Sequence, residues 1–115
     1  MRKLATLTID PTAANPLKLD MPAGTLGALE ELYRAFVNSP VPQPILFTIL
    51  GSEGADTWTI PLGVPVHFRT PFGAITEKEN ARFYRQKQQL QERADVGASI
   101  TFDNAWELLD HKDLG

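Results

Sequence analysis

The sequence predicts a single α+β domain over residues 1–115, with two main helices against a small, mostly antiparallel sheet. Three observations support this fold class. Short segments with strand patterns alternate with two longer segments of helical periodicity. The composition, with 43% hydrophobic and 22% charged residues, is that of a globular protein with a packed core. The chain has no cysteine, which excludes disulfides, thiolate zinc sites and cysteine nucleophiles.

The first third of the chain contains the clearest helix. Residues 3–9 alternate apolar residues with threonines, which is typical of a half-buried strand. Residues 10–24 are rich in Pro, Asp and Asn and predict a loop with a short extended piece at residues 17–19. Thr25 is the expected N-cap of a helix over residues 26–38, which Ser39-Pro40 ends. Its apolar face comprises Leu26, Leu29, Leu32, Tyr33, Phe36 and Val37.

The middle of the chain predicts a β-hairpin after a stiff connector, SPVPQP. Residues 45–50, ILFTIL, form a continuous apolar run, as expected for a strand buried on both faces. A Gly-containing turn leads to the second arm, residues 57–70. Because Pro61 and Pro65 cannot donate ladder hydrogen bonds, this arm is predicted to be an edge strand, or two short pieces broken near Gly63.

The last third predicts a polar helix, a short strand and a terminal helix. Thr76 and Glu79 form a capping box that begins a helix running to about Ala94. Residues 98–102 are a predicted strand, and Asp103 can cap a short helix within the C-terminal segment, residues 103–115. The resulting β-α-β-β-α-β order is that of the ferredoxin-like arrangement, although other α+β sandwiches remain open.

Several function classes find no support in the sequence. There is no Gly-rich phosphate-binding loop, and the two histidines, His67 and His111, lack metal-ligand spacing, so we expect no cofactor and no metal. No apolar segment approaches the roughly 20 residues of a membrane span, and the N-terminus lacks a signal-peptide pattern. A soluble, cytoplasmic protein without membrane association is therefore the expectation.

His67 and Arg69 are the weak candidates for a ligand-binding or catalytic site. Residues two apart on a strand share one face, so these two should point outward while Val66 and Phe68 point inward. Arginine could bind a carboxylate or phosphate while histidine transfers a proton. The pattern favours the simpler alternative, in which both residues belong to the solvated face of a half-buried strand.

Residues 82–87 are the one locally basic stretch, with aromatic residues interleaved. Arg82, Arg85 and Lys87 could contact phosphates, and Tyr84 could stack on a base. However, residues 77–95 carry five positive and four negative charges, a net charge of +1, which favours a solvated helix face over a nucleic-acid interface. The C-terminal segment is the electrostatic complement, because four acidic residues and one lysine give it a charge of −3 alongside Trp106, Leu108 and Leu109.

The sequence therefore predicts a non-catalytic protein-interaction module that forms a homo-oligomer or binds another protein. The contact surfaces would be the helix over residues 76–94 and the acidic C-terminal segment. The alternatives are a small-ligand site or enzyme at His67 and Arg69, or weak nucleic-acid binding. The predicted interaction residues are Arg82, Tyr84, Arg85, Lys87, Trp106 and Leu109.

Overall fold

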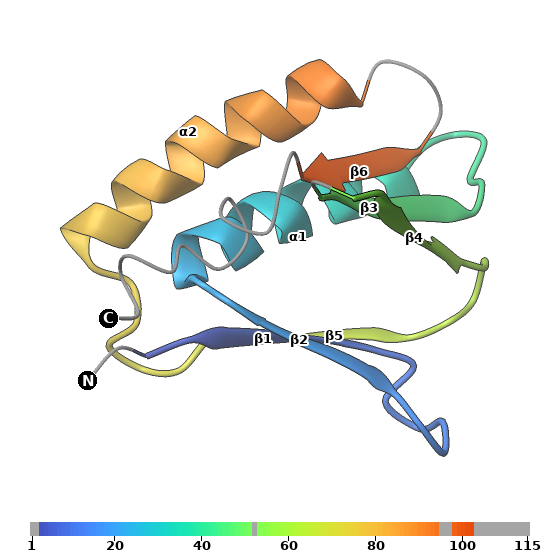
Figure 1. Cartoon of the computed structure of the whole chain (residues 1–115), viewed down its shortest axis with the longest axis horizontal. Helices are drawn as coiled ribbons and strands as arrows, with labels where there is room; N and C mark the ends of the chain where they lie inside the picture. Colours follow the sequence, from blue (N-terminus) through green and yellow to red (C-terminus); the bar gives the residue numbers. More distant parts are fainter. Residues whose placement is uncertain (1–2, 52, 95–97, 103–115) are drawn as a thin grey trace.

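Two helices and two three-stranded sheets make up the computed structural model, which describes residues 3–51, 53–94 and 98–102 (Figure 1). The fold class is therefore α+β, as predicted. In chain order the elements are β1 (Ala5–Ile9), β2 (Leu17–Met21), α1 (Ala23–Val37), β3 (Ile45–Leu50), β4 (Ala55–Ile60), β5 (Val66–Arg69), α2 (Glu77–Arg93) and β6 (Ser99–Phe102).

The first sheet, here called the N-terminal sheet, has the order β2-β1-β5 and is antiparallel throughout. Leu7 of the central strand lies opposite Leu19 on one side and Phe68 on the other. Ala5 and Leu7 are buried, so the apolar positions of the alternating pattern face the interior. The threonines between them lie on the opposite face.

The second sheet, here called the hairpin sheet, has the order β4-β3-β6. The predicted hairpin over ILFTIL and its partner is present as the antiparallel pair β3–β4, and β6 joins β3 in parallel. Phe47 at the centre of β3 is fully buried, with its ring centroid 5.7 Å from Trp58 and 5.8 Å from Phe102. Burying an aromatic side chain of this kind stabilises a fold by roughly 1.5–3 kcal/mol.

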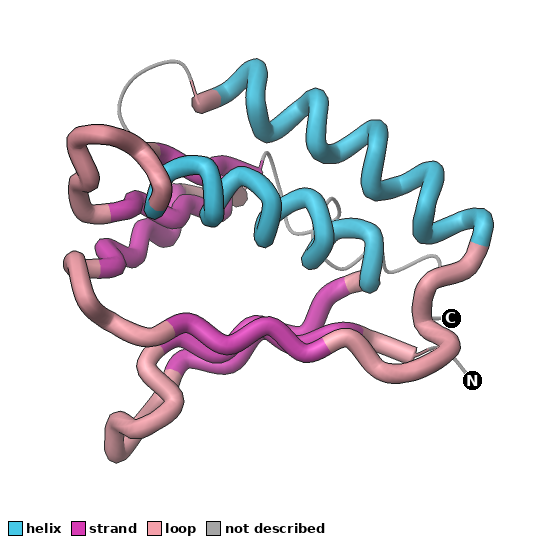
Figure 2. Tube along the Cα trace, turned by 180° about the vertical axis from the view of Figure 1, so that it is seen from behind, coloured by secondary structure: helices cyan, strands magenta, loops and turns pink. Residues whose placement is uncertain are grey.

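Helix α1 lies between the N-terminal sheet and α2, and the hairpin sheet lies beside it (Figures 1 and 2). Both sheets and both helices contribute side chains to one core. Its largest fully buried apolar side chains are Leu7, Met21, Leu26, Leu29, Phe47, Leu90, Ile100 and Phe102.

The strand arrangement differs from the single small sheet expected, and the ferredoxin-like order is not confirmed. The extended piece predicted at residues 17–19 is a full strand, β2, paired with β1 along its length. The second hairpin arm is divided at residues 61–65, where Gly63 has φ +85° and Val64 N–H donates to the Pro61 carbonyl at 3.3 Å. β4 remains with β3, whereas β5 crosses to pair with β1. The predicted terminal helix lies outside the described residues.

The start of α1 also differs from the prediction. Pro22 is the N-cap residue, and the helix begins at Ala23 rather than after Thr25. Thr25 lies inside the first turn with its side chain fully buried, and its hydroxyl donates to Oε1 of Gln86. The prediction is wrong here because the first turn of α1 is satisfied by a side chain from α2 rather than by a local cap.

Candidate functional site

Helix α2 contacts the N-terminal end of α1 closely at Gly24. A Cβ atom added to Gly24 would lie only 2.1 Å from the backbone oxygen of Glu79 and 3.0 Å from the backbone nitrogen of Phe83. Only glycine fits at this position, because neither contact is with a side chain that could move aside. The close approach lets polar groups of the two helices bond directly.

A buried polar network joins the two helices at this contact. Oε1 of Glu79 accepts a hydrogen bond from Gly24 N–H at 2.9 Å, and Nε of Arg82 donates to Oε2 of Glu79 at 3.3 Å. One turn further along α2, Gln86 accepts the hydroxyl of Thr25. All of these side chains are buried. A carboxylate at a helix N-terminus is also favoured by the helix dipole, so α1 is capped by its neighbour.

Glu79 therefore serves two helices at once. Its backbone N–H donates to the hydroxyl of Thr76 at 3.2 Å, which confirms the predicted N-cap of α2. In a capping box the glutamate side chain would turn back to its own cap residue. Here the carboxylate instead reaches Gly24 across the helix–helix contact. The sequence motif identifies the helix start correctly but does not reveal the partner.

The network places Arg82, a predicted interaction residue, in the interior. The residue is only 3% exposed, and its guanidinium bonds to the Glu79 carboxylate. Arg82 holds the two helices together and presents no cationic surface to a partner. The sequence contained a signal for this position, because Glu79 and Arg82 are spaced as an i, i+3 ion pair on one face.

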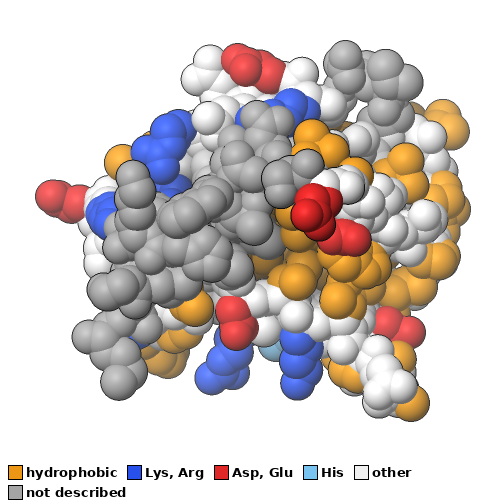
Figure 3. Space-filling model, viewed as in Figure 1, with side chains coloured by type: hydrophobic (Ala, Val, Ile, Leu, Met, Phe, Trp, Pro, Cys, Tyr) orange, Lys and Arg blue, Asp and Glu red, His pale blue; other side chains and the backbone are white. Residues whose placement is uncertain are grey.

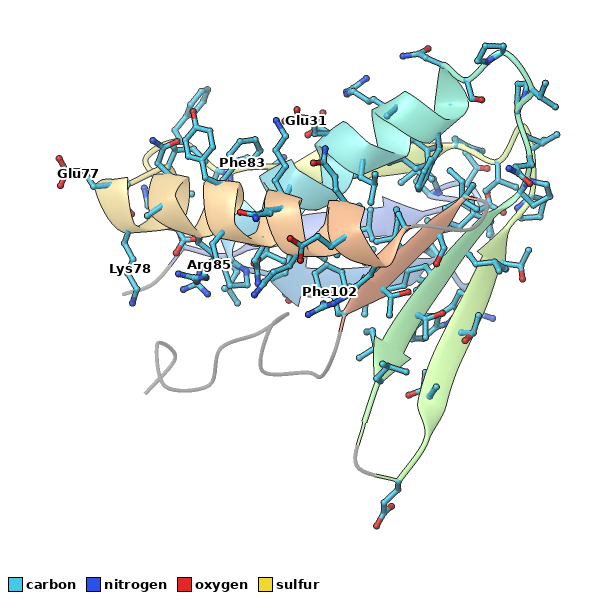
Figure 4. All side chains as sticks on the ribbon, turned by 90° about the horizontal axis from the view of Figure 1, so that it is seen from above. Glu31, Glu77, Lys78, Phe83, Arg85 and Phe102 are labelled. Carbon is cyan, nitrogen blue, oxygen red and sulfur yellow. The ribbon has the colours of Figure 1, made fainter. Side chains whose placement is uncertain are left out.

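Arg85 and Lys87 lie on opposite flanks of α2. They are two residues apart, which is a turn of about 200° around a helix. Nζ of Lys87 pairs with Oε1 of Glu31 at 2.7 Å and lies 5.8 Å from the Phe83 ring centroid, so Lys87 faces α1. Figure 4 shows Arg85 and Lys78 projecting on the side of α2 away from Glu31.

The three predicted basic residues thus do not form one surface. Lys87 is paired against α1, Arg82 is buried and Arg85 points the other way. Lys78, Arg85 and Gln89 do share a face, since spacings of seven and four residues place them within about 40° of each other around the helix. We call this face the basic flank of α2.

The outward surface of α2 carries Tyr84, another predicted interaction residue. Its side chain is 63% exposed, and its ring makes an edge contact with Phe83 at 5.1 Å between centroids. Just before α2, the turn over residues 71–74 displays Phe72, which is 99% exposed, while Nζ of Lys3 donates to the Phe72 carbonyl at 2.7 Å. Sequence reasoning missed Phe72. Trp106 and Leu109 lie outside the described residues.

His67 and Arg69 lie where the alternation predicted. Both are exposed on the outer face of the N-terminal sheet, while Val66 and Phe68 pack against the core. The register adds Lys18 to this face, because Thr8 lies opposite both Lys18 and His67. Figure 3 shows a histidine and two Lys or Arg side chains along the lower edge of the molecule. The face is an open sheet surface.

A hollow of roughly 230 Å³ lies elsewhere, at the C-terminal end of α1, and was not foreseen. Its lining is mostly apolar and comes from α1, the proline-containing connector and the segment between β4 and β5. Neither His67 nor Arg69 contributes to it. Because the three segments are far apart in sequence, no local pattern could have indicated the hollow. The lining includes Tyr33, Phe36, Val37, Pro42, Gln43, Ile45 and residues 60–64.

Within the described ranges, no group of three or more His, Cys, Asp or Glu side chains is arranged to hold a metal ion. Neither described helix is long and apolar enough to cross a membrane. Comparisons with models of protein families, with curated proteins and with solved structures gave no significant match. The functional argument therefore depends on the surfaces of this chain alone.

Proposed function

We propose that this chain is a small, non-catalytic protein-interaction module that self-associates through α2 and its acidic C-terminal segment. The observation that carries the proposal is the asymmetry of α2. One flank is neutralised by α1 through Lys87 and Glu31, whereas the basic flank keeps Lys78 and Arg85 at the surface. A segment with charge −3 and three large apolar residues is a suitable partner for such a surface.

In this proposal, two copies exchange their C-terminal segments, each lying on the basic flank of the other copy. Such an exchange is isologous, because the same pair of surfaces meets twice, and it closes as a dimer. The buried network of Glu79 and Arg82 supports this role by fixing α2 on α1. A rigidly held helix loses little conformational entropy when a partner binds.

Charge reversal tests the proposal in the full chain. Sedimentation velocity would be measured over a concentration series that reaches about millimolar protein, where tethered and free segments compete. We expect the oligomer seen with the natural sequence to be lost in K78E/R85E and in E107K/D110K. Combining both reversals should restore it, because the attraction is re-formed with opposite signs.

A matched control is K18E, which makes the same charge change on the outer face of the N-terminal sheet. It should leave the oligomer unchanged. A monomer at every concentration with the natural sequence would exclude self-association, and equal losses in K18E would show a general charge effect.

The alternative of a small-ligand site retains one favourable observation. Lys18 shares the outer face of the N-terminal sheet with His67 and Arg69, so three basic groups could meet one anion. A thermal-shift panel of phosphates and carboxylates would test this, with H67A/R69A as the comparison. A stabilising anion whose effect disappears in the double variant would support the site, and the absence of any stabilising anion would exclude it.

A further inference from the structure

We propose that residues 103–115 also fold back on their own chain and cover its basic flank, so that self-association requires this segment to leave it. The inference rests on the proposed contact between the segment and α2, but not on that contact being made between copies. Three features of the described residues support it: where β6 ends, how far the flank lies from that end, and the charge of the flank.

The C-terminal segment starts from a fixed point. Phe102, the last residue of β6, is buried and in ring contact with Phe47. Nη1 of Arg93 donates to the carbonyl of Thr101 at 3.2 Å, which ties the end of β6 to the last turn of α2. Figure 4 shows Phe102 on the same side of α2 as Arg85 and Lys78. The segment therefore leaves the core directly at the basic flank.

The flank is within reach of the segment. Arg93 marks the point on α2 next to β6, and Arg85 lies eight residues before it, a rise of about 12 Å along a helix. Lys78 lies fifteen residues before Arg93, about 22 Å away along the same axis. The 13 residues from 103 to 115 span about 20 Å as a helix and about 43 Å when fully extended.

The charges of flank and segment are complementary. Lys78 and Arg85 face outward there together with uncharged Gln89, while the segment carries Asp103, Glu107, Asp110 and Asp113 against one lysine. The long stems of lysine and arginine also offer apolar surface on which Trp106 and Leu109 could lie. The flank thus presents both kinds of contact that the segment needs.

Connectivity favours closure within one chain over exchange between chains. No linker separates the segment from Phe102, and a short tether gives an effective concentration in the millimolar range. At lower protein concentration the same contacts form more readily within a copy than between copies. The dimer then arises by exchanging segments that were already docked, and raising the concentration promotes it.

The absence of cysteine makes a spin-label experiment clean, since any introduced thiol is the sole attachment point. A nitroxide attached to Q89C would broaden NMR signals of groups near the basic flank. The readout is the indole N–H of Trp106, and Trp58 serves as an internal reference within the core. A label on V41C, at an exposed position in the connector after α1, is the control.

Two samples distinguish the two modes. In the first, the isotope-labelled chain carries the nitroxide, and we expect loss of the Trp106 signal with Q89C but not with V41C. In the second, nitroxide-bearing Q89C chains are mixed at low concentration with isotope-labelled chains that carry no label, and the Trp106 signal should persist. Adding K78E/R85E to the first sample should restore the signal.

Signal loss only in the mixed sample would show docking on a second copy and overturn the inference. Persistence of the signal in both samples would show that the segment leaves the flank uncovered, which also overturns it. Failure of the proposed function is separate, because a chain that stays monomeric at millimolar concentration could still lose the Trp106 signal in the first sample.

Discussion

Gly24 lies where the backbone of α1 meets that of α2, and its missing side chain makes the contact possible. The added Cβ would meet a backbone oxygen at 2.1 Å, far inside the normal contact distance. At Gly27, one turn further along α1, a Cβ would meet only the ring of Phe83 at 3.1 Å. The two glycines therefore differ in what they would displace, since a ring can shift more readily than a helix backbone.

We expect G24A to destabilise the fold by about 1–3 kcal/mol or more, because the two helices must move apart to admit the methyl group. This cost exceeds the gain of up to about 1 kcal/mol in helix propensity from replacing glycine with alanine. The free energy of urea unfolding measures the difference. G27A is the matched control and should cost clearly less, so equal costs at the two positions would contradict the backbone clash.

At the scale of elements, Glu79 and Arg82 couple α2 to the first turn of α1. Removing one member of a buried ion pair leaves the other without compensation, whereas removing both can be tolerated. Both side chains are nearly inaccessible, so solvent screens the pair only weakly. The pair should therefore behave as a unit in mutagenesis.

We expect R82M to lower the free energy of unfolding by about 3–5 kcal/mol, since the Glu79 carboxylate stays buried with fewer partners. The double variant E79Q/R82M should be more stable than the sum of the two single losses indicates. A double-mutant cycle by urea unfolding provides the measurement. Additive losses would show that the two side chains do not act on each other.

The helices also show how far local patterns predict structure. Periodicity and the Thr76 cap gave the extent of α2 to within a residue of its observed end at Arg93. The start of α1 was missed because its cap comes from Glu79, which lies 55 residues away in sequence. For the candidate surface, the sequence gave the exposure of Tyr84 but not the burial of Arg82, because burial depends on which helix face meets α1.

At the scale of the whole molecule, strand pairing was the least predictable feature. Alternation predicted correctly that Val66 and Phe68 face inward and His67 and Arg69 outward. It could not show that this strand pairs with β1, because any strand with one apolar face can join any matching edge. The division into two sheets depends on that long-range choice.

Both sheets share one core, so the molecule should unfold in a single transition. Side chains of the N-terminal sheet, the hairpin sheet and both helices belong to one buried cluster, and a domain of this size commonly unfolds cooperatively. We expect the urea curves from far-UV circular dichroism and from tryptophan fluorescence to coincide. Separate midpoints would show that the two sheets lose structure independently.

The position of β3 has a consequence for solubility. Its sequence, ILFTIL, is an uncharged six-residue run of high β-propensity, the type of segment that forms cross-β aggregates when exposed. In the native state β4 and β6 occupy its two edges, and Pro42 and Pro44 precede it. Because β6 is only four residues long, its detachment would free one edge of β3 while most of the fold remained intact. The short parallel strand at the end of the described chain thus acts as a guard against self-templated fibre growth.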